Sequence, residues 1–146
     1  MKPTLNALLL LVLSTTLVPG VQADSGCTDA TLTGSYSFNL TGWNVSLTPD
    51  GLLDLSNSHL GNNVGTATFD GAGNFSTSFF SCDNGACGKI GDKGTYRVKP
   101  DCSGKLQLGK GKNAFHWGLA ISNGGNQVYM IAIDPSSNVS GTATKQ

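Results

Sequence analysis

Polar and apolar residues alternate with a period of two through most of this chain beyond residue 30, and short glycine-rich turns separate the alternating stretches. In the segment 31–40, for example, Tyr36, Phe38 and Leu40 alternate with polar residues. Successive side chains of a strand point to opposite faces, so this pattern is typical of half-buried β-strands. The same region carries no amphipathic helical stripe, and the chain lacks Glu, a common residue of solvent-facing helix. The alternation therefore predicts an all-β protein.

The alternating stretches are short and follow one another closely. About eight strands are expected, over residues 31–40, 64–69, 74–80, 94–98, 105–108, 114–121, 127–133 and 139–144. Hairpin-length turns such as Asp70–Gly73 favour antiparallel neighbours, since parallel pairing needs long crossovers. Eight sequential antiparallel strands can close into an up-and-down barrel, whereas the alternative, a β-sandwich, usually needs longer Greek-key links. We therefore expect an antiparallel up-and-down barrel.

The segment 43–63 lacks this regular alternation. It contains Asn44 and the turn signal Pro49-Asp50-Gly51, but also Leu52, Leu53, Leu55 and Leu60. About twenty residues without regular structure is long for a connection in a compact domain. Two interpretations remain open from the sequence: a lid across the barrel mouth, or a strap-like surface loop that packs its own leucines.

The first 23 residues have the features of a secretory signal peptide. Lys2 supplies the positive charge, residues 8–13 form a short apolar core, and the small residue Ala23 precedes Asp24. The apolar run is much shorter than the roughly 20 residues that span a membrane. We expect cleavage after Ala23, a single domain over residues 24–146, and a secreted or periplasmic protein.

Four cysteines lie in the expected mature chain: Cys27, Cys82, Cys87 and Cys102. An even number in an exported protein favours disulfides, and three pairings exist. The close spacing of Cys82 and Cys87 favours a local Cys82–Cys87 bridge, with Cys27–Cys102 as a long tether. Zinc is the alternative, but the pair is not a C-x-x-C motif and neither histidine lies near it. We expect two disulfides, no metal site and no cofactor.

Charge narrows the class of partner. Nine Lys and Arg balance nine acidic residues, and Arg97 is the one arginine, so the basic surface typical of nucleic-acid binding is missing. No segment beyond the signal peptide is apolar and long enough for a membrane span. The expected partner is a small hydrophobic molecule, and the sequence names no protein partner.

Aromatic residues on the expected strands are the candidate ligand contacts. Tyr36, Phe38 and Tyr96 are expected inside the barrel, and further candidates are Phe115, Trp117 and Tyr129. A barrel of eight strands is either filled by such side chains or holds one small ligand. The segment 127–133 is apolar on both faces, which indicates cover on both sides. Its Tyr129, Ile131 and Ile133 face is a candidate interaction surface.

Few residues suit acid–base catalysis. His116 faces opposite to Phe115 and Trp117, so it would point into the lumen, as a general acid or base, only if those aromatic rings faced away. A surface or hydrogen-bonded histidine is the more common case, and no Gly-x-Ser-x-Gly motif is present. The sequence favours a binding barrel or an interaction module over an enzyme. The enzymatic alternative is a cofactor-free cyclase or isomerase acting on an apolar substrate in the lumen.

Several turn and strand-start motifs together resemble a known kind of protein. They are Leu32–Phe38, Gly65–Asn74, Gly94–Val98 with Asp101–Gly104, and Ser140–Gln146. Over nearly the whole expected mature chain they resemble small exported bacterial proteins of largely unassigned role, and barrels of the calycin type, which include lipocalins and allene-oxide-cyclase-like barrels. The resemblance implies a fold, and it transfers no catalytic residue.

Overall fold

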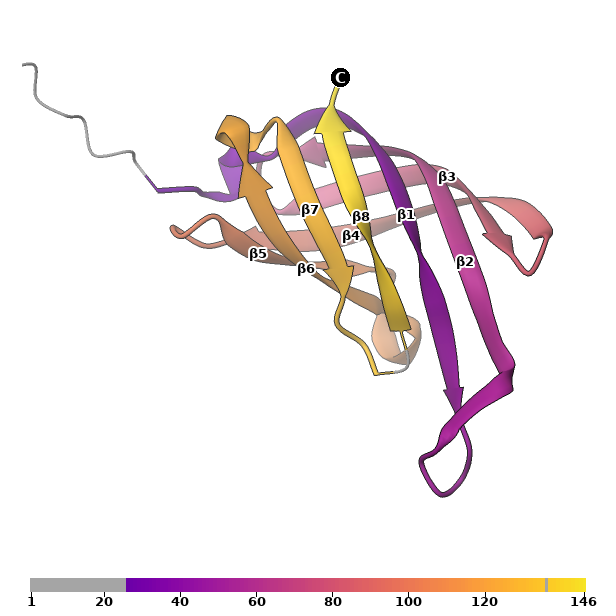
Figure 1. The fold of residues 1–146 in the computed structure, drawn as a ribbon. Coiled ribbons are helices and arrows are strands. Elements are labelled where there is room, and N and C mark those ends of the chain that lie inside the picture. The colour runs from indigo at the N-terminus through magenta and orange to yellow at the C-terminus, as the bar shows by residue number, and fades with distance from the viewer. Residues whose placement is uncertain (1–25, 136) are drawn as a thin grey trace, which may run out of the picture.

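Eight antiparallel strands follow one another in chain order around a closed barrel in the computed structural model, which describes residues 26–135 and 137–146 (Figure 1). The predicted signal peptide, residues 1–23, lies outside the described residues. The prediction of an all-β up-and-down barrel is confirmed. The strands are β1 (Thr33–Leu47), β2 (Leu53–Asp70), β3 (Asn74–Asp83), β4 (Ala86–Val98), β5 (Ser103–Leu108), β6 (Phe115–Ser122), β7 (Gln127–Ala132) and β8 (Ser137–Lys145), with short 3-10 turns η1 (Asp29–Thr31), η2 (Gly111–Asn113) and η3 (Asn123–Gly125).

The first and last strands close the barrel. β1 pairs with β8 from Tyr36 opposite Lys145 to Asn44 opposite Ser137. Close approach of strands requires glycine at some inward positions: a Cβ at Gly94 would overlap the carbonyl oxygen of Gln107 and the ring of Phe75. Glycine at such points lets a strand bend sharply enough for the sheet to close.

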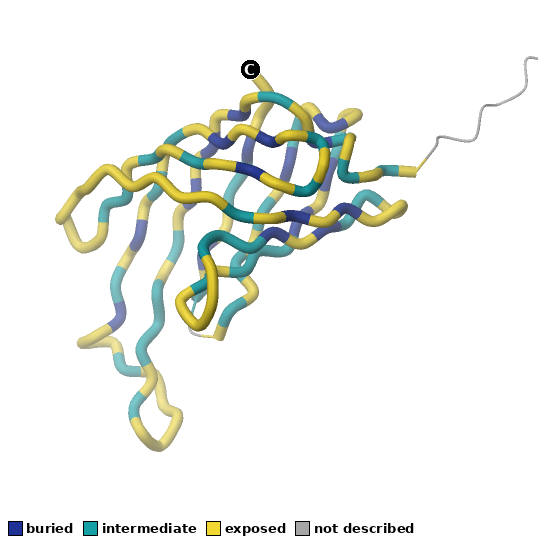
Figure 2. Tube along the Cα trace, turned by 180° about the vertical axis from the view of Figure 1, so that it is seen from behind, coloured by how far each residue is buried: buried dark blue, intermediate teal, exposed yellow. Residues whose placement is uncertain are grey.

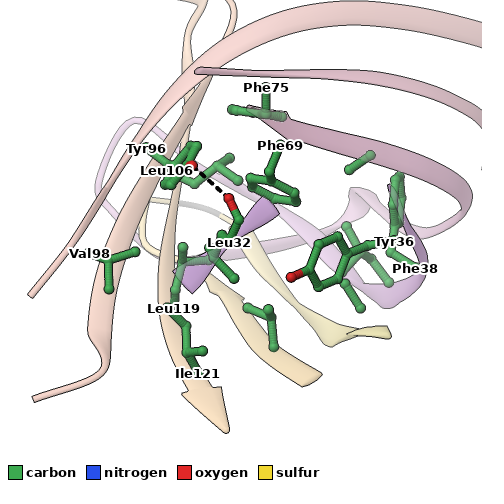
Figure 3. Close-up of a cluster of buried hydrophobic side chains, with 14 of the residues drawn as sticks. Leu32, Tyr36, Phe38, Phe69, Phe75, Tyr96, Val98, Leu106, Leu119 and Ile121 are labelled. Carbon is green, nitrogen blue, oxygen red and sulfur yellow. Dashed lines mark hydrogen bonds between the residues drawn. The ribbon is translucent and has the colours of Figure 1, made fainter. Parts of the chain in front are cut away.

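The hydrophobic core fills one end of the barrel, which we call the closed end. Phe69 contacts three rings there: Tyr36 and Tyr96 edge-on, with centroids 5.2 and 5.1 Å away, and Phe75 in a stacked arrangement at 5.4 Å. Leu32, directly after η1, is fully buried beneath these rings and plugs the end of the lumen (Figure 3). The Tyr96 hydroxyl donates to the carbonyl oxygen of Leu32 at 2.9 Å, which holds the plug in place.

The segment 43–63, expected to be an irregular lid or strap, is instead a regular β-hairpin extension. β1 continues to Leu47 and β2 begins at Leu53, with Trp43 opposite Leu60 and a register shift between Asn44 and Ser46. Figure 1 shows this hairpin projecting beyond the rest of the barrel. Because most of it meets solvent on both faces, no core selects apolar residues at every second position, and the alternation that predicts strands elsewhere is missing.

A second extension is formed by β3 and β4. The predicted strands 74–80 and 94–98 are longer in the structure, because β3 runs to Asp83 and β4 begins at Ala86. The Cys82–Cys87 disulfide clips the tip of this hairpin, and the Cys27–Cys102 disulfide ties the N-terminal segment to the β4–β5 turn. Both predicted disulfides are therefore confirmed.

Buried residues gather at the closed end, and the two hairpin extensions are largely exposed (Figure 2). Within the described part of the chain, no helix is long and apolar enough to cross a membrane.

Candidate functional site

The opposite end of the barrel, which we call the open end, contains a cavity of about 330 Å³. Fourteen of its twenty-one lining residues are apolar, so most of its wall would exclude water from a bound molecule. The apolar lining consists of Phe38, Leu40, Ala67, Phe69, Phe75, Phe79, Ile90, Leu106, Leu108, Phe115, Trp117, Met130, Val139 and Ala143.

Phe69 and Phe75 belong both to this lining and to the aromatic cluster of the closed end. The cavity therefore stops at a floor of packed rings and does not run through the barrel as a channel. Figure 3 shows these rings together with Leu106, which also lines the cavity.

Polar side chains occupy the inward positions of the strands near the mouth. They come from the extended strands β1–β4 and from the start of β8, and they are Asn44, Asn63, Thr77, Ser81, Asp83, Asp92 and Ser137. One polar side-chain contact joins the two hairpin extensions, because His59 Nε2 lies 2.9 Å from Asp83 Oδ2. The site thus combines an apolar floor and wall with a polar mouth.

Three of the six predicted ligand contacts line this cavity. Phe38 enters from β1, and Phe115 and Trp117 enter from β6. Phe115 is still 58% exposed, which places it at the rim rather than in the depth of the cavity.

Tyr36 and Tyr96 lie inside the barrel but at the closed end, outside the cavity lining. The Tyr36 hydroxyl donates to the carbonyl oxygen of Gly125 at 2.6 Å, and the Tyr96 hydroxyl donates to the carbonyl oxygens of Asp29 and Leu32. Burial raises the pKa of both phenols. These two tyrosines therefore act in packing, with their polar ends satisfied by backbone.

Tyr129 lies on the outer surface of β7 and is 50% exposed, because its neighbours Val128 and Met130 point inward. With Ile131 and Ile133 it forms an exposed apolar stripe on the outside of the barrel. The structure thus separates Tyr129 from the other predicted ligand contacts.

His116 also faces outward, since the adjacent Phe115 and Trp117 line the cavity. Its Nδ1 lies 2.8 Å from Asp134 Oδ1, and its backbone N–H donates to Asp134 Oδ2 at 2.6 Å. Partial burial raises the pKa of Asp134, but the hydrogen bonds from His116 outweigh it and hold the pKa below its ordinary value. A catalytic role for His116 in the lumen required Phe115 and Trp117 to face away from it, and the structure has the opposite orientation.

The His116–Asp134 pair borders an open groove of about 620 Å³ on the outer face of β4–β6. The groove is larger than the lumen cavity but is lined mainly by polar and charged side chains, among them Thr95, Arg97 and Lys105. In the described residues no three His, Cys, Asp or Glu side chains come together as metal ligands.

Several cavity residues were not predicted from the sequence. Ile90 and Asp92 lie in the part of β4 that was not expected to be a strand. Both residues lie an even number of positions before Tyr96 and Val98, so in a continuous strand they would share the inward face of these two residues. The glycines between them, Gly91 and Gly94, interrupt the polar–apolar alternation that would have shown this. Phe79, in contrast, follows the expected alternation from Phe75 and could have been included.

Comparison with protein-family models finds no match for this chain, and comparison with curated proteins finds none either. Among solved structures, the chain is similar to a de novo designed fluorescence-activating β-barrel. The two share 12% sequence identity with a TM-score of 0.49, over 80% of this chain and 94% of the designed one. The strand topology of this chain supports the resemblance to calycins only as far as a small closed β-barrel, and no family is assigned.

Proposed function

We propose that this protein binds a small apolar molecule in the open end of its barrel. The observation that carries the proposal is the apolar cavity of about 330 Å³, which is closed below by aromatic rings and open at the mouth. Ligand cavities in proteins have volumes from about 300 Å³ upward and are lined mostly by apolar side chains with a few polar groups. The two disulfides are consistent with action outside the cytoplasm, in the periplasm or medium.

Binding is favoured over catalysis by where the ionisable groups lie. Among the described residues of the lining, Asp83 and Asp92 are the ones with acidic side chains, and both are exposed at the mouth. General acid–base catalysis works best when the pKa of the catalytic group lies near the operating pH, and a carboxyl group reaches such a pKa through burial. The cyclase or isomerase hypothesis gains no support from this arrangement.

An interaction module is the second candidate, favoured by the outer stripe of Tyr129, Ile131 and Ile133, each about half exposed. The stripe lies outside the barrel and the cavity lies within it, so the two roles are structurally independent. Exposed apolar residues are common on protein surfaces, whereas an open apolar cavity needs an explanation. We therefore rank binding first.

The test is titration with N-phenyl-1-naphthylamine, a neutral dye that fluoresces in apolar surroundings. The native protein should bind the dye, and Met130→Trp should weaken binding at least about tenfold because the larger ring fills the cavity. Ile131→Trp is the matched control, since this next residue of β7 is 52% exposed on the outer face. Far-ultraviolet circular dichroism verifies that both variants fold. Absence of dye binding, or equal binding by Met130→Trp, would contradict the proposal.

A further inference from the structure

The charged side chains in the cavity wall all have one sign. Among the described lining residues, Asp83 and Asp92 carry charge, and neither Lys, Arg nor His contributes to the wall. They lie at separate points of the mouth. Asp83 is the last residue of β3, whereas Asp92 belongs to β4 and pairs with Thr77 of β3. The wall therefore presents two spaced carboxylates around an otherwise apolar volume.

Each carboxylate retains an oxygen for a further partner. Asp83 pairs with His59 through Oδ2, and Asp92 Oδ1 accepts the backbone N–H of Lys93 at 2.7 Å. Within residues 26–135 and 137–146, the second oxygen of each side chain has no ion pair or hydrogen bond. Carboxylates in this state are ready acceptors for an N–H donor of a ligand.

The nearby lysines do not offset the negative charge of the cavity wall. Lys89 and Lys93 alternate with Ile90 and Asp92 along β4 and therefore point outward. Lys110 and Lys112 lie in the exposed β5–β6 turn, where solvent screens their charge. None of these four residues belongs to the cavity wall.

We propose that the ligand of this cavity is an apolar molecule with one positively charged nitrogen, its apolar body against the aromatic floor and its ammonium group among the mouth carboxylates. This inference rests on the proposed function. An ammonium at the mouth keeps part of its hydration, so it avoids most of the cost of burying a charge. A ligand carboxylate in the same position would meet two like charges, which disfavours fatty acids.

The experiment compares three probes with the same ten-carbon chain: decylamine, decan-1-ol and decanoate, each displacing N-phenyl-1-naphthylamine at pH 7. The native protein should bind decylamine at least about tenfold more tightly than decanoate, with decan-1-ol between them. Asp92→Asn and Asp83→Asn should each reduce the ratio of amine to carboxylate affinity several-fold, because decylamine loses an attractive charge and decanoate loses a repulsive one. Asp50→Asn, in the exposed β1–β2 turn, removes the same charge outside the cavity wall and should leave the ratio unchanged.

The outcomes separate the two proposals. Equal or tighter binding of decanoate overturns the inference about charge while leaving an apolar binding site intact. A preference for decylamine that survives in both Asp83→Asn and Asp92→Asn overturns the assignment to these carboxylates. If neither the dye nor any probe binds, the proposed function fails and this inference fails with it. Decylamine preference lost in the two cavity variants and kept in Asp50→Asn supports the inference.

Discussion

The two ends of the barrel are built from the same strands but packed in different ways. At the closed end, Phe69 contacts the rings of both Tyr36 and Tyr96 above the buried Leu32, and the two tyrosine hydroxyl groups donate to backbone carbonyl oxygens. At the open end, Phe38 and Trp117 surround a cavity of about 330 Å³. Packed rings therefore fill the lumen at the closed end, whereas the rings at the open end border an unfilled volume.

Strand length explains why the open end is open. The first four strands have 15, 18, 10 and 13 residues, whereas β5, β6 and β7 have 6, 8 and 6. Strands around a barrel share one wall height, so the extra residues of β1–β4 must extend past it at one end. A cavity in a barrel can thus arise from strands of unequal length as well as from small side chains.

The largest expected effect concerns the two disulfides, one at each end. Replacing Cys27 and Cys102 together by Ser should lower the free energy of unfolding by about 4.5 kcal/mol, because this bridge closes a long loop. Replacing Cys82 and Cys87 together should cost only about 2 kcal/mol, since that loop is short. Urea denaturation measures both, and the two double variants serve as controls for each other. A larger loss from the Cys82–Cys87 pair would mean that the open end contributes more to stability than the closed end.

A smaller effect is expected from deleting one ring at each end. Phe69→Ala should lower the free energy of unfolding by about 4 kcal/mol, because Phe69 is 3% exposed and contacts three other rings. Phe79→Ala should cost about 1–2 kcal/mol, because Phe79 is half-buried and already borders the cavity. The same urea series measures both variants. Equal losses would show that the two ends are packed equally well.

The smallest effect concerns the outer surface. The hydrogen bonds from His116 hold the pKa of Asp134 below its ordinary value, so the folded state holds this proton less tightly than the unfolded chain does. The stabilisation of the folded state by the Asp134 carboxylate is fully present above about pH 4, and it is lost as the pH falls further through the lowered pKa of this group. Asp134→Asn should therefore lower stability at pH 7 by less than about 1 kcal/mol, since the carboxylate is partly exposed.

Thermal melts between pH 2 and pH 7 check this expectation. The difference between the native protein and Asp134→Asn should narrow in acid, and Asp50→Asn, whose carboxylate lies in an exposed turn, provides the comparison. A difference that stays constant over this range would contradict a role for the Asp134 charge.

Much of the fold could be predicted because it depends on local patterns. The alternation through Tyr36 and Phe38 predicts a strand, and the turn Asp70–Gly73 predicts the hairpin between β2 and β3. The pairing of Cys82 with Cys87 follows from their spacing. The hairpin extension over 43–63 escaped prediction because its backbone pairing leaves no trace in the polarity of its exposed side chains.

The candidate site was harder to predict. Alternation shows that Phe115 and Trp117 share one face and His116 the other, yet it cannot say which face is inside. That choice depends on the register of β6 against β5 and β7, where Trp117 lies opposite Leu106 and Ala132. The residues that join the cavity wall from distant strands, such as Asp92 and Met130, are set by the same long-range pairing.

The amino-acid sequence by itself determined the all-β class and the order of the hairpins and favoured the Cys82–Cys87 bridge, because each follows from interactions between residues close in the chain or from a repeat of period two. Only the tertiary structure decided that one half of the lumen is filled and the other is open, and that Tyr36 and Tyr96 belong to the first and Phe38 to the second. The physical reason is that an unfilled volume is a sum over side chains from all eight strands. That sum is defined only once the strands have closed into a ring.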